Sequence, residues 1–160
     1  MKILRSHLNA GDMAAEGFDG WPWGMKDTVR FSELDPLNHV NNAAYLSWFE
    51  TARIGYIMDY GLTGMTHTEA DPQIVVRRQV VDYLAPILFG ETYVVAMRTT
   101  RIKPSSIVME YAVFVGDETR ATGETVIVSL TQDGAARQPW RTEAIGRMME
   151  RDGAKAVGFD

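Results

Sequence analysis

Hydrophobic residues follow two different periods along the chain. Between Ala43 and about Tyr60 they recur at helical spacings around most of the circumference, which predicts a helix that is buried on most sides. Gly61 then supplies a C-terminal stop. After a polar loop the period changes to that of β-structure, and four strands are predicted at about 73–84, 92–102, 106–115 and 120–130.

One further strand is expected ahead of the helix, over 25–33, where Val29 and Phe31 lie in a weakly alternating run. A helix that is apolar on most sides needs cover on most sides. The pattern therefore predicts an α+β fold in which an antiparallel five-stranded sheet wraps around one long central helix.

The two ends of the chain read as additions to this unit, and a single domain is expected over 1–160. The segment 1–24 is predicted to be an irregular arm because it has no regular apolar period and is rich in glycine and proline near its end. Trp21 and Trp23 in this arm are expected in the core or in an interface. The segment 136–160 predicts a short charged helix and a tail, with Pro139 near the helix start.

Composition narrows the class of protein. The 160 residues are 46% hydrophobic, which is enough to form a core. The net charge is -5, so nucleic acid is not an expected partner. The chain has no cysteine, which agrees with a reducing compartment. No signal peptide or membrane span is read in the sequence, so a cytoplasmic protein with no membrane partner is expected.

A polar stretch, "ELDPLNHVNN" (33–42), lies immediately before the predicted helix. Asp35-Pro36 favours a turn, and Asn41 and Asn42 are good N-cap residues. The N-H groups at a helix start have no partner within the helix, so they can stabilise a carbonyl oxygen that develops negative charge. A carboxylate and a histidine nearby, Asp35 and His39, suit proton transfer or nucleophilic attack, although turn and cap roles alone would also explain all four residues.

The stretch "FSELDPLNHVNNAAYLSWFETAR" resembles the signature of hotdog-fold acyl-CoA thioesterases, the 4-hydroxybenzoyl-CoA thioesterase-like family. The resemblance implies that Asp35 is the catalytic base or nucleophile and that the backbone N-H of Asn42 polarises the thioester carbonyl. It also implies that His39 assists. Leu37 departs from the branch that acts on acyl carrier proteins, which has asparagine two residues after the aspartate.

Further residues are assigned to substrate binding. Asn41 and Tyr45 adjoin the loop, and the phosphates of coenzyme A need cations, for which Arg98, Arg101 and Lys103 are the first candidates. Arg77 and Arg78 form a second candidate pair. Glu50 and Arg53, three apart on the helix, are expected to form an ion pair.

The sequence therefore predicts a thioesterase that hydrolyses acyl-CoA to free acid and coenzyme A, as a homodimer or a dimer of dimers. No metal and no cofactor are expected, because coenzyme A is part of the substrate and the three histidines lie in no clear metal pattern. The alternatives are a thioesterase acting on acyl carrier proteins, a protein that binds acyl thioesters without hydrolysing them, and a hydratase or dehydratase of the same fold.

Overall fold

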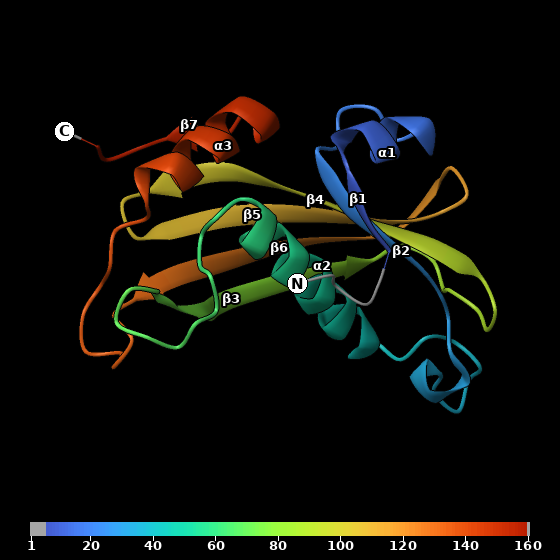
Figure 1. Ribbon diagram of the computed structural model, residues 1–160. Coiled ribbons are helices and arrows are strands. Elements are labelled where there is room, and N and C mark those ends of the chain that lie inside the picture. The colour runs from blue at the N-terminus through green and yellow to red at the C-terminus, as the bar shows by residue number, and fades with distance from the viewer. Residues whose placement is uncertain (1–5, 160) are drawn as a thin grey trace. The chain divides into compact units, whose positions relative to one another are not determined.

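A computed structural model of the chain describes residues 6–159 and contains three α-helices and seven strands in that range (Figure 1). The helices are α1 (Ala10–Ala15), α2 (Ala44–Asp59) and α3 (Thr142–Asp152). The strands are β1 (Ser6–Asn9), β2 (Trp23–Thr28), β3 (Gln73–Tyr83), β4 (Thr92–Lys103), β5 (Ser106–Val115), β6 (Glu118–Leu130) and β7 (Lys155–Ala156).

The strands form one sheet in the order β1-β2-β4-β5-β6-β3, with β7 also paired to β4. The predicted helix 43–60 and the four predicted strands that follow it are confirmed to within two residues at each end. The prediction of five strands is wrong, since β1 and β7 add two. Both are short, at 4 and 2 residues, and a period of two cannot be recognised over so few positions.

Two other boundaries differ from the prediction. The strand expected over 25–33 ends at Thr28, and a 3-10 turn follows at Phe31–Glu33, where the Glu33 carboxylate accepts the backbone N-H of Arg30 at 2.9 Å. The prediction of an irregular arm is also wrong for the part that the structure describes. There β1 pairs antiparallel with β2, and α1 follows β1 in the chain (Figure 1). Residues 1–5 of the predicted arm lie outside the described residues.

The described chain divides into two compact units. The first comprises the described part of Met1–Gly55 together with Val81–Met97 and Tyr111–Gly123. In this unit, aromatic side chains of α2 pack on strands: Trp48 stacks on Tyr93 with ring centroids 3.9 Å apart, and Phe49 stacks on Tyr111 at 4.4 Å. This packing explains why so much of the helix is apolar.

A separate apolar cluster in the first unit holds α1. Met13 is fully buried against Val94 and Ala96 of β4, and partly buried hydrophobic residues surround this contact: Leu8, Phe18, Trp21 and Phe114. Trp23 is also buried, and its indole N-H donates to the carbonyl of Ala52 at 3.1 Å. Both tryptophans are therefore packing residues, as predicted.

The second unit comprises Tyr56–Val80, Arg98–Glu110 and the described part of Glu124–Asp160. The carboxylate of Asp152, the last residue of α3, accepts hydrogen bonds from the hydroxyls of Tyr56 at 2.5 Å and Tyr60 at 2.6 Å, and from the backbone N-H of Thr99 at 2.7 Å. Burial raises the pKa of Asp152. These bonds attach the predicted C-terminal helix to the last turn of α2 and to β4.

Candidate functional site

The polar stretch before α2 folds into a closed loop. Leu34 and Val40 pair in antiparallel fashion, and the backbone N-H of Val40 donates to the carbonyl of Ile87 at 2.9 Å. The Glu33 carboxylate accepts the indole N-H of Trp48 at 2.9 Å, which ties the start of the loop to α2. The loop is thus fixed both by its own pairing and by its neighbours.

Asp35 lies at the turn of this loop and is half-buried. One carboxylate oxygen accepts the backbone N-H of Leu37 at 2.9 Å and, more weakly, that of His39 at 3.3 Å. Its own backbone N-H donates to the carbonyl of His39 at 2.8 Å. The turn role expected for this aspartate is therefore real. The other carboxylate oxygen makes no hydrogen bond within residues 6–159, so it can engage a water molecule or a substrate.

His39 is held by its main chain rather than by its ring. It pairs with Leu88 in a single bridge and with Asp35 through the backbone bonds above. The imidazole is exposed and contacts no hydrogen-bonding partner among the described residues. The neighbouring Asn38 has a φ of 62°, a left-handed conformation that asparagine tolerates better than most residues, and this lets the loop close.

α2 begins at Ala44, one residue after the predicted start at Ala43. The helix start thus agrees with the prediction to one residue, and the capping contact expected of the asparagines is made by Asn41. Asn41 closes the turn, since its side-chain oxygen accepts the N-H of Ala43 at 2.9 Å and its carbonyl accepts the N-H of Ala44 at 2.9 Å.

The backbone N-H and the backbone carbonyl of Asn42 differ in their hydrogen bonding. Within residues 6–159 its N-H donates to no protein acceptor, whereas its carbonyl accepts the hydroxyl of Tyr83 at 2.8 Å. Tyr83 also packs edge-on against Tyr45, with ring centroids 5.1 Å apart. Sequence reasoning did not find Tyr83. Its only sequence signal is an aromatic residue at the end of a predicted strand.

Tyr45 lies in the first turn of α2 and is buried. Burial, with a smaller contribution from Tyr83, raises the pKa of Tyr45 to about 12, so the phenol is neutral at physiological pH. The ring packs against Trp48, with centroids 4.9 Å apart. Tyr45 is therefore part of the packing under the loop.

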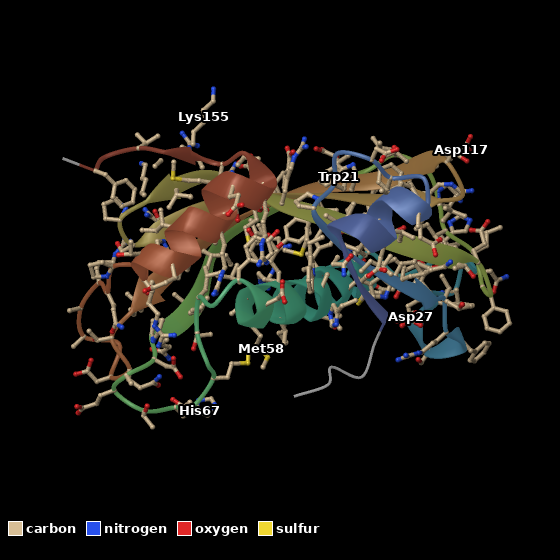
Figure 2. The ribbon with its side chains drawn as sticks, turned by 45° about the horizontal axis from the view of Figure 1, so that its top comes forward. Trp21, Asp27, Met58, His67, Asp117 and Lys155 are labelled. Atoms are coloured by element: carbon tan, nitrogen blue, oxygen red, sulfur yellow. The ribbon has the colours of Figure 1, made fainter. Side chains whose placement is uncertain are left out.

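The three basic residues assigned to the phosphates differ in their surroundings. Arg98 forms an ion pair with Glu110, so its charge is already offset. Arg101 and Lys103 are exposed and form no ion pair within the described chain. The parallel pairing of β7 with β4 places Lys155 opposite Arg101, and Figure 2 shows Lys155 projecting away from the ribbon. In the second candidate pair, Arg78 bonds Glu124 at 3.2 Å and Arg77 is exposed.

The predicted Glu50–Arg53 ion pair is wrong. Arg53 is buried, and its guanidinium donates to the hydroxyl of Tyr111 at 3.0 Å, while Glu50 is exposed. Spacing of three allows two side chains to meet on a helix surface, but Arg53 lies on the buried side and Glu50 on the solvent side.

Across residues 6–159 no group of three or more histidine, cysteine, aspartate or glutamate side chains is placed to hold a metal ion. In the same range no helix is long and apolar enough to cross a bilayer.

Comparison with known proteins identifies the family. The profile of the Thioesterase-like superfamily matches residues 29–152, which include the whole loop, α2 and the strands β3 to β6. The chain belongs to this superfamily. The resemblance carried by the stretch 31–53 is thereby confirmed.

Relatives of the superfamily include one protein of uncharacterised function and one named hydrolase. YsmA of Bacillus subtilis is 29% identical over 74% of this chain and 79% of its own length. A 1,4-dihydroxy-2-naphthoyl-CoA hydrolase of Synechococcus is 27% identical over 64% of this chain and 73% of its own.

Solved structures of the superfamily share the fold. A thioesterase superfamily protein from Jannaschia has a TM-score of 0.89 at 32% identity, covering 98% of this chain and 100% of its own. A Thermus thermophilus thioesterase, solved with coenzyme A and zinc, has a TM-score of 0.71 at 38% identity, covering 85% of this chain and 98% of its own. The fold is the predicted α+β hotdog fold, with a helix packed against an antiparallel sheet.

Proposed function

We propose that this superfamily member hydrolyses acyl-CoA thioesters to a free carboxylic acid and coenzyme A. The observation that carries the proposal is that one closed loop presents two groups with no hydrogen-bond partner among residues 6–159: one carboxylate oxygen of Asp35, and the backbone N-H of Asn42 just before α2. Thioester hydrolysis needs both kinds of group: one to deliver the nucleophile, and one to stabilise the oxyanion.

Asp35 acts in one of two ways. As a general base it takes a proton from water while the water oxygen attacks the thioester carbonyl; as a nucleophile it attacks the carbonyl itself, and water then cleaves the resulting anhydride. In both routes the carbon–sulfur bond breaks, and coenzyme A leaves as a thiol once its sulfur is protonated. The Asn42 N-H, together with the positive end of the α2 dipole, stabilises the negative oxygen.

His39 and the basic residues have supporting roles in this proposal. The exposed imidazole of His39 can hold water or shuttle a proton near Asp35. Arg101 and Lys103 contact the phosphates of coenzyme A. No metal or other cofactor takes part. The coenzyme A bound to the Thermus thioesterase and the name of the Synechococcus hydrolase support a coenzyme A thioester as the substrate class.

Replacement of the carboxylate tests the proposal. We expect Asp35→Asn to lower kcat by about two or more powers of ten, because removal of a base or nucleophile has effects of this size. Thiol release from a panel of acyl-CoA thioesters of varied length and polarity gives the rates. Asp117→Asn, in the exposed turn between β5 and β6, is the matched control and should keep the wild-type rate. Hydrolysis by Asp35→Asn at the wild-type rate would remove Asp35 from the mechanism.

The same assays separate the alternatives. Purified protein that retains acyl-CoA but releases no thiol would indicate a binding protein. Addition of water to an enoyl-CoA without thiol release would indicate a hydratase. Faster hydrolysis of acyl groups on a carrier protein than on coenzyme A would move the assignment to the carrier-protein class.

We also propose that the active form is a homodimer or a dimer of dimers. Exposed apolar side chains lie at this loop and beside it: Leu37 in the loop is 74% exposed, and Leu88, which pairs with His39, is 45% exposed. A second protomer would cover them. One chain has a mass of 17.9 kDa, and sedimentation at that mass alone would contradict an oligomer.

A further inference from the structure

The first turn of α2 does not use the carbonyl of Asn42. The N-H of Ala44 bonds the carbonyl of Asn41 at 2.9 Å, and the N-H of Leu46 bonds the carbonyl of Ala43 at 3.2 Å. The Asn42 carbonyl between them instead accepts the Tyr83 hydroxyl at 2.8 Å. A side chain from β3, 41 residues further along the chain, therefore holds the residue whose N-H is the proposed oxyanion donor.

Tyr83 is itself held in place from two directions. Its ring packs against Tyr45 in a nearly perpendicular arrangement, at 87°. The residue that follows it, Leu84, donates its N-H to the carbonyl of Arg120 at 2.9 Å, and the Arg120 guanidinium donates to the carbonyl of Pro86 at 2.6 Å. The hydroxyl is thus delivered from a segment that is fixed to β6.

The Tyr83 hydroxyl is protonated and can donate a hydrogen bond. Burial raises the pKa of Tyr83 above its ordinary value of 10.0, so the hydroxyl keeps its proton throughout the physiological range.

We propose that Tyr83 is a positioning residue for the Asn42 N-H. The N-H and the carbonyl of one residue belong to adjacent peptide planes that turn only about φ and ψ. The Asn41 side chain fixes the peptide after Asn42 by bonding the N-H of Ala43, and Tyr83 fixes the carbonyl of that same peptide from the other end. Because an oxyanion donor is effective only when it is oriented before the charge develops, loss of this restraint weakens catalysis without weakening substrate binding. The inference rests on the proposed function.

The variant Tyr83→Phe removes the hydroxyl and keeps the ring against Tyr45. We expect kcat to fall by about tenfold, less than the loss of a donor itself, while KM stays within about twofold. The melting temperature is measured alongside. Tyr60→Phe is the matched control: it removes a phenol hydrogen bond to Asp152 at 2.6 Å, and should lower the melting temperature while kcat stays at the wild-type value.

Three outcomes overturn the inference. The first is a kcat of Tyr83→Phe within twofold of the wild-type value. The second is a rise in KM with kcat unchanged, which would make Tyr83 a substrate contact. The third is a fall in kcat that matches the loss of folded protein. These outcomes test the role of Tyr83 only if the wild-type protein hydrolyses acyl-CoA and the Asp35→Asn variant does not. If wild type releases no thiol, the proposed function fails instead, so the two failures are distinct.

Discussion

Asp71 organises the polar loop between α2 and β3 from within. The residue is 3% exposed, and its carboxylate accepts the backbone N-H groups of Gly64 and Thr66 at 2.9 Å each, the Thr66 hydroxyl at 2.5 Å, and the Arg141 guanidinium at 2.5 Å. The Thr66 hydroxyl, followed by the two backbone N-H groups, lowers the pKa of Asp71 well below its ordinary value of 3.8. The loop conformation thus depends on this carboxylate being ionised.

Asp71→Asn should destabilise the protein in a pH-dependent way. At about pH 7 we expect the free energy of unfolding to fall by about 2 kcal/mol, because hydrogen bonds to a charged acceptor are lost. A depressed pKa stabilises the fold above the unfolded value and loses that effect as pH falls toward the folded value. The difference between wild type and variant should therefore shrink below about pH 4.

Urea unfolding at a series of pH values measures this difference. Glu69→Gln, an exposed carboxylate in the same loop, is the control and should leave the free energy of unfolding unchanged at every pH. A gap between wild type and Asp71→Asn that stays constant from neutral to acidic pH would mean that the charge of Asp71 is not its source.

Among single residues, the sequence was informative where the chemistry is local. Asp35, Asn41 and Asn42 belong to one turn-and-cap segment, so short-range rules found the loop and the helix start. The Glu50–Arg53 prediction failed because spacing along a helix does not tell which side is buried. Tyr83 was missed because its partner lies far away along the chain.

At the scale of elements, two glycines mark α3: Gly146 lies inside the helix and Gly153 lies directly after its end. Gly153 follows the helix with a φ of 68°, and its N-H bonds the carbonyl of Met149 at 3.2 Å, a left-handed C-terminal stop. Gly146 lies inside the helix and is exposed. An added methyl group would meet no atom within 4 Å at either position, so only backbone conformation separates the two.

Alanine at these two positions should have opposite effects. Gly153→Ala should lower the free energy of unfolding by about 1 kcal/mol, because a side chain disfavours the left-handed region. Gly146→Ala should raise it by about 1 kcal/mol, because alanine favours the helix interior. Denaturant unfolding of both variants checks the signs, and equal effects of the two changes would show that the C-terminal stop does not depend on the glycine.

The elements themselves divide into those that pattern predicts and those that it does not. The long strands and α2 were predicted because each repeats its apolar period several times. β1, α1 and β7 are too short for that, and they form because β2 and β4 offer backbone groups to pair with and because Met13 finds an apolar site on Val94 and Ala96.

At the scale of the whole molecule, net charge opposes the proposed substrate. A chain of charge -5 repels a polyanion such as coenzyme A, so local cations must outweigh the overall field. Arg101 and Lys103 are suited to this because, unlike Arg98, they form no ion pair within the described chain. The effect of removing them should therefore appear in substrate binding.

We expect the double variant Arg101→Gln/Lys103→Gln to raise KM for acyl-CoA by about tenfold, since two charge-assisted contacts to phosphate are lost, and to leave kcat near wild type. An acyl thioester of N-acetylcysteamine, which lacks the nucleotide, should show no change in KM. Added salt should reduce the difference between wild type and variant. Arg77→Gln is the comparison, and a larger rise in KM for that variant would transfer the phosphate contact to the second candidate pair.

The family, the order of the long elements and the loop before α2 can all be predicted from the amino-acid pattern, because helix period, strand period and turn chemistry depend on residues that are close together in the chain. Which polar groups find a partner within the described chain depends on folding. Among the described residues, Tyr83 bonds the Asn42 carbonyl while the Asn42 N-H has no partner, and Glu110 offsets the charge of Arg98 while Arg101 forms no ion pair. Such pairings join residues that only folding brings together, and no local pattern encodes them.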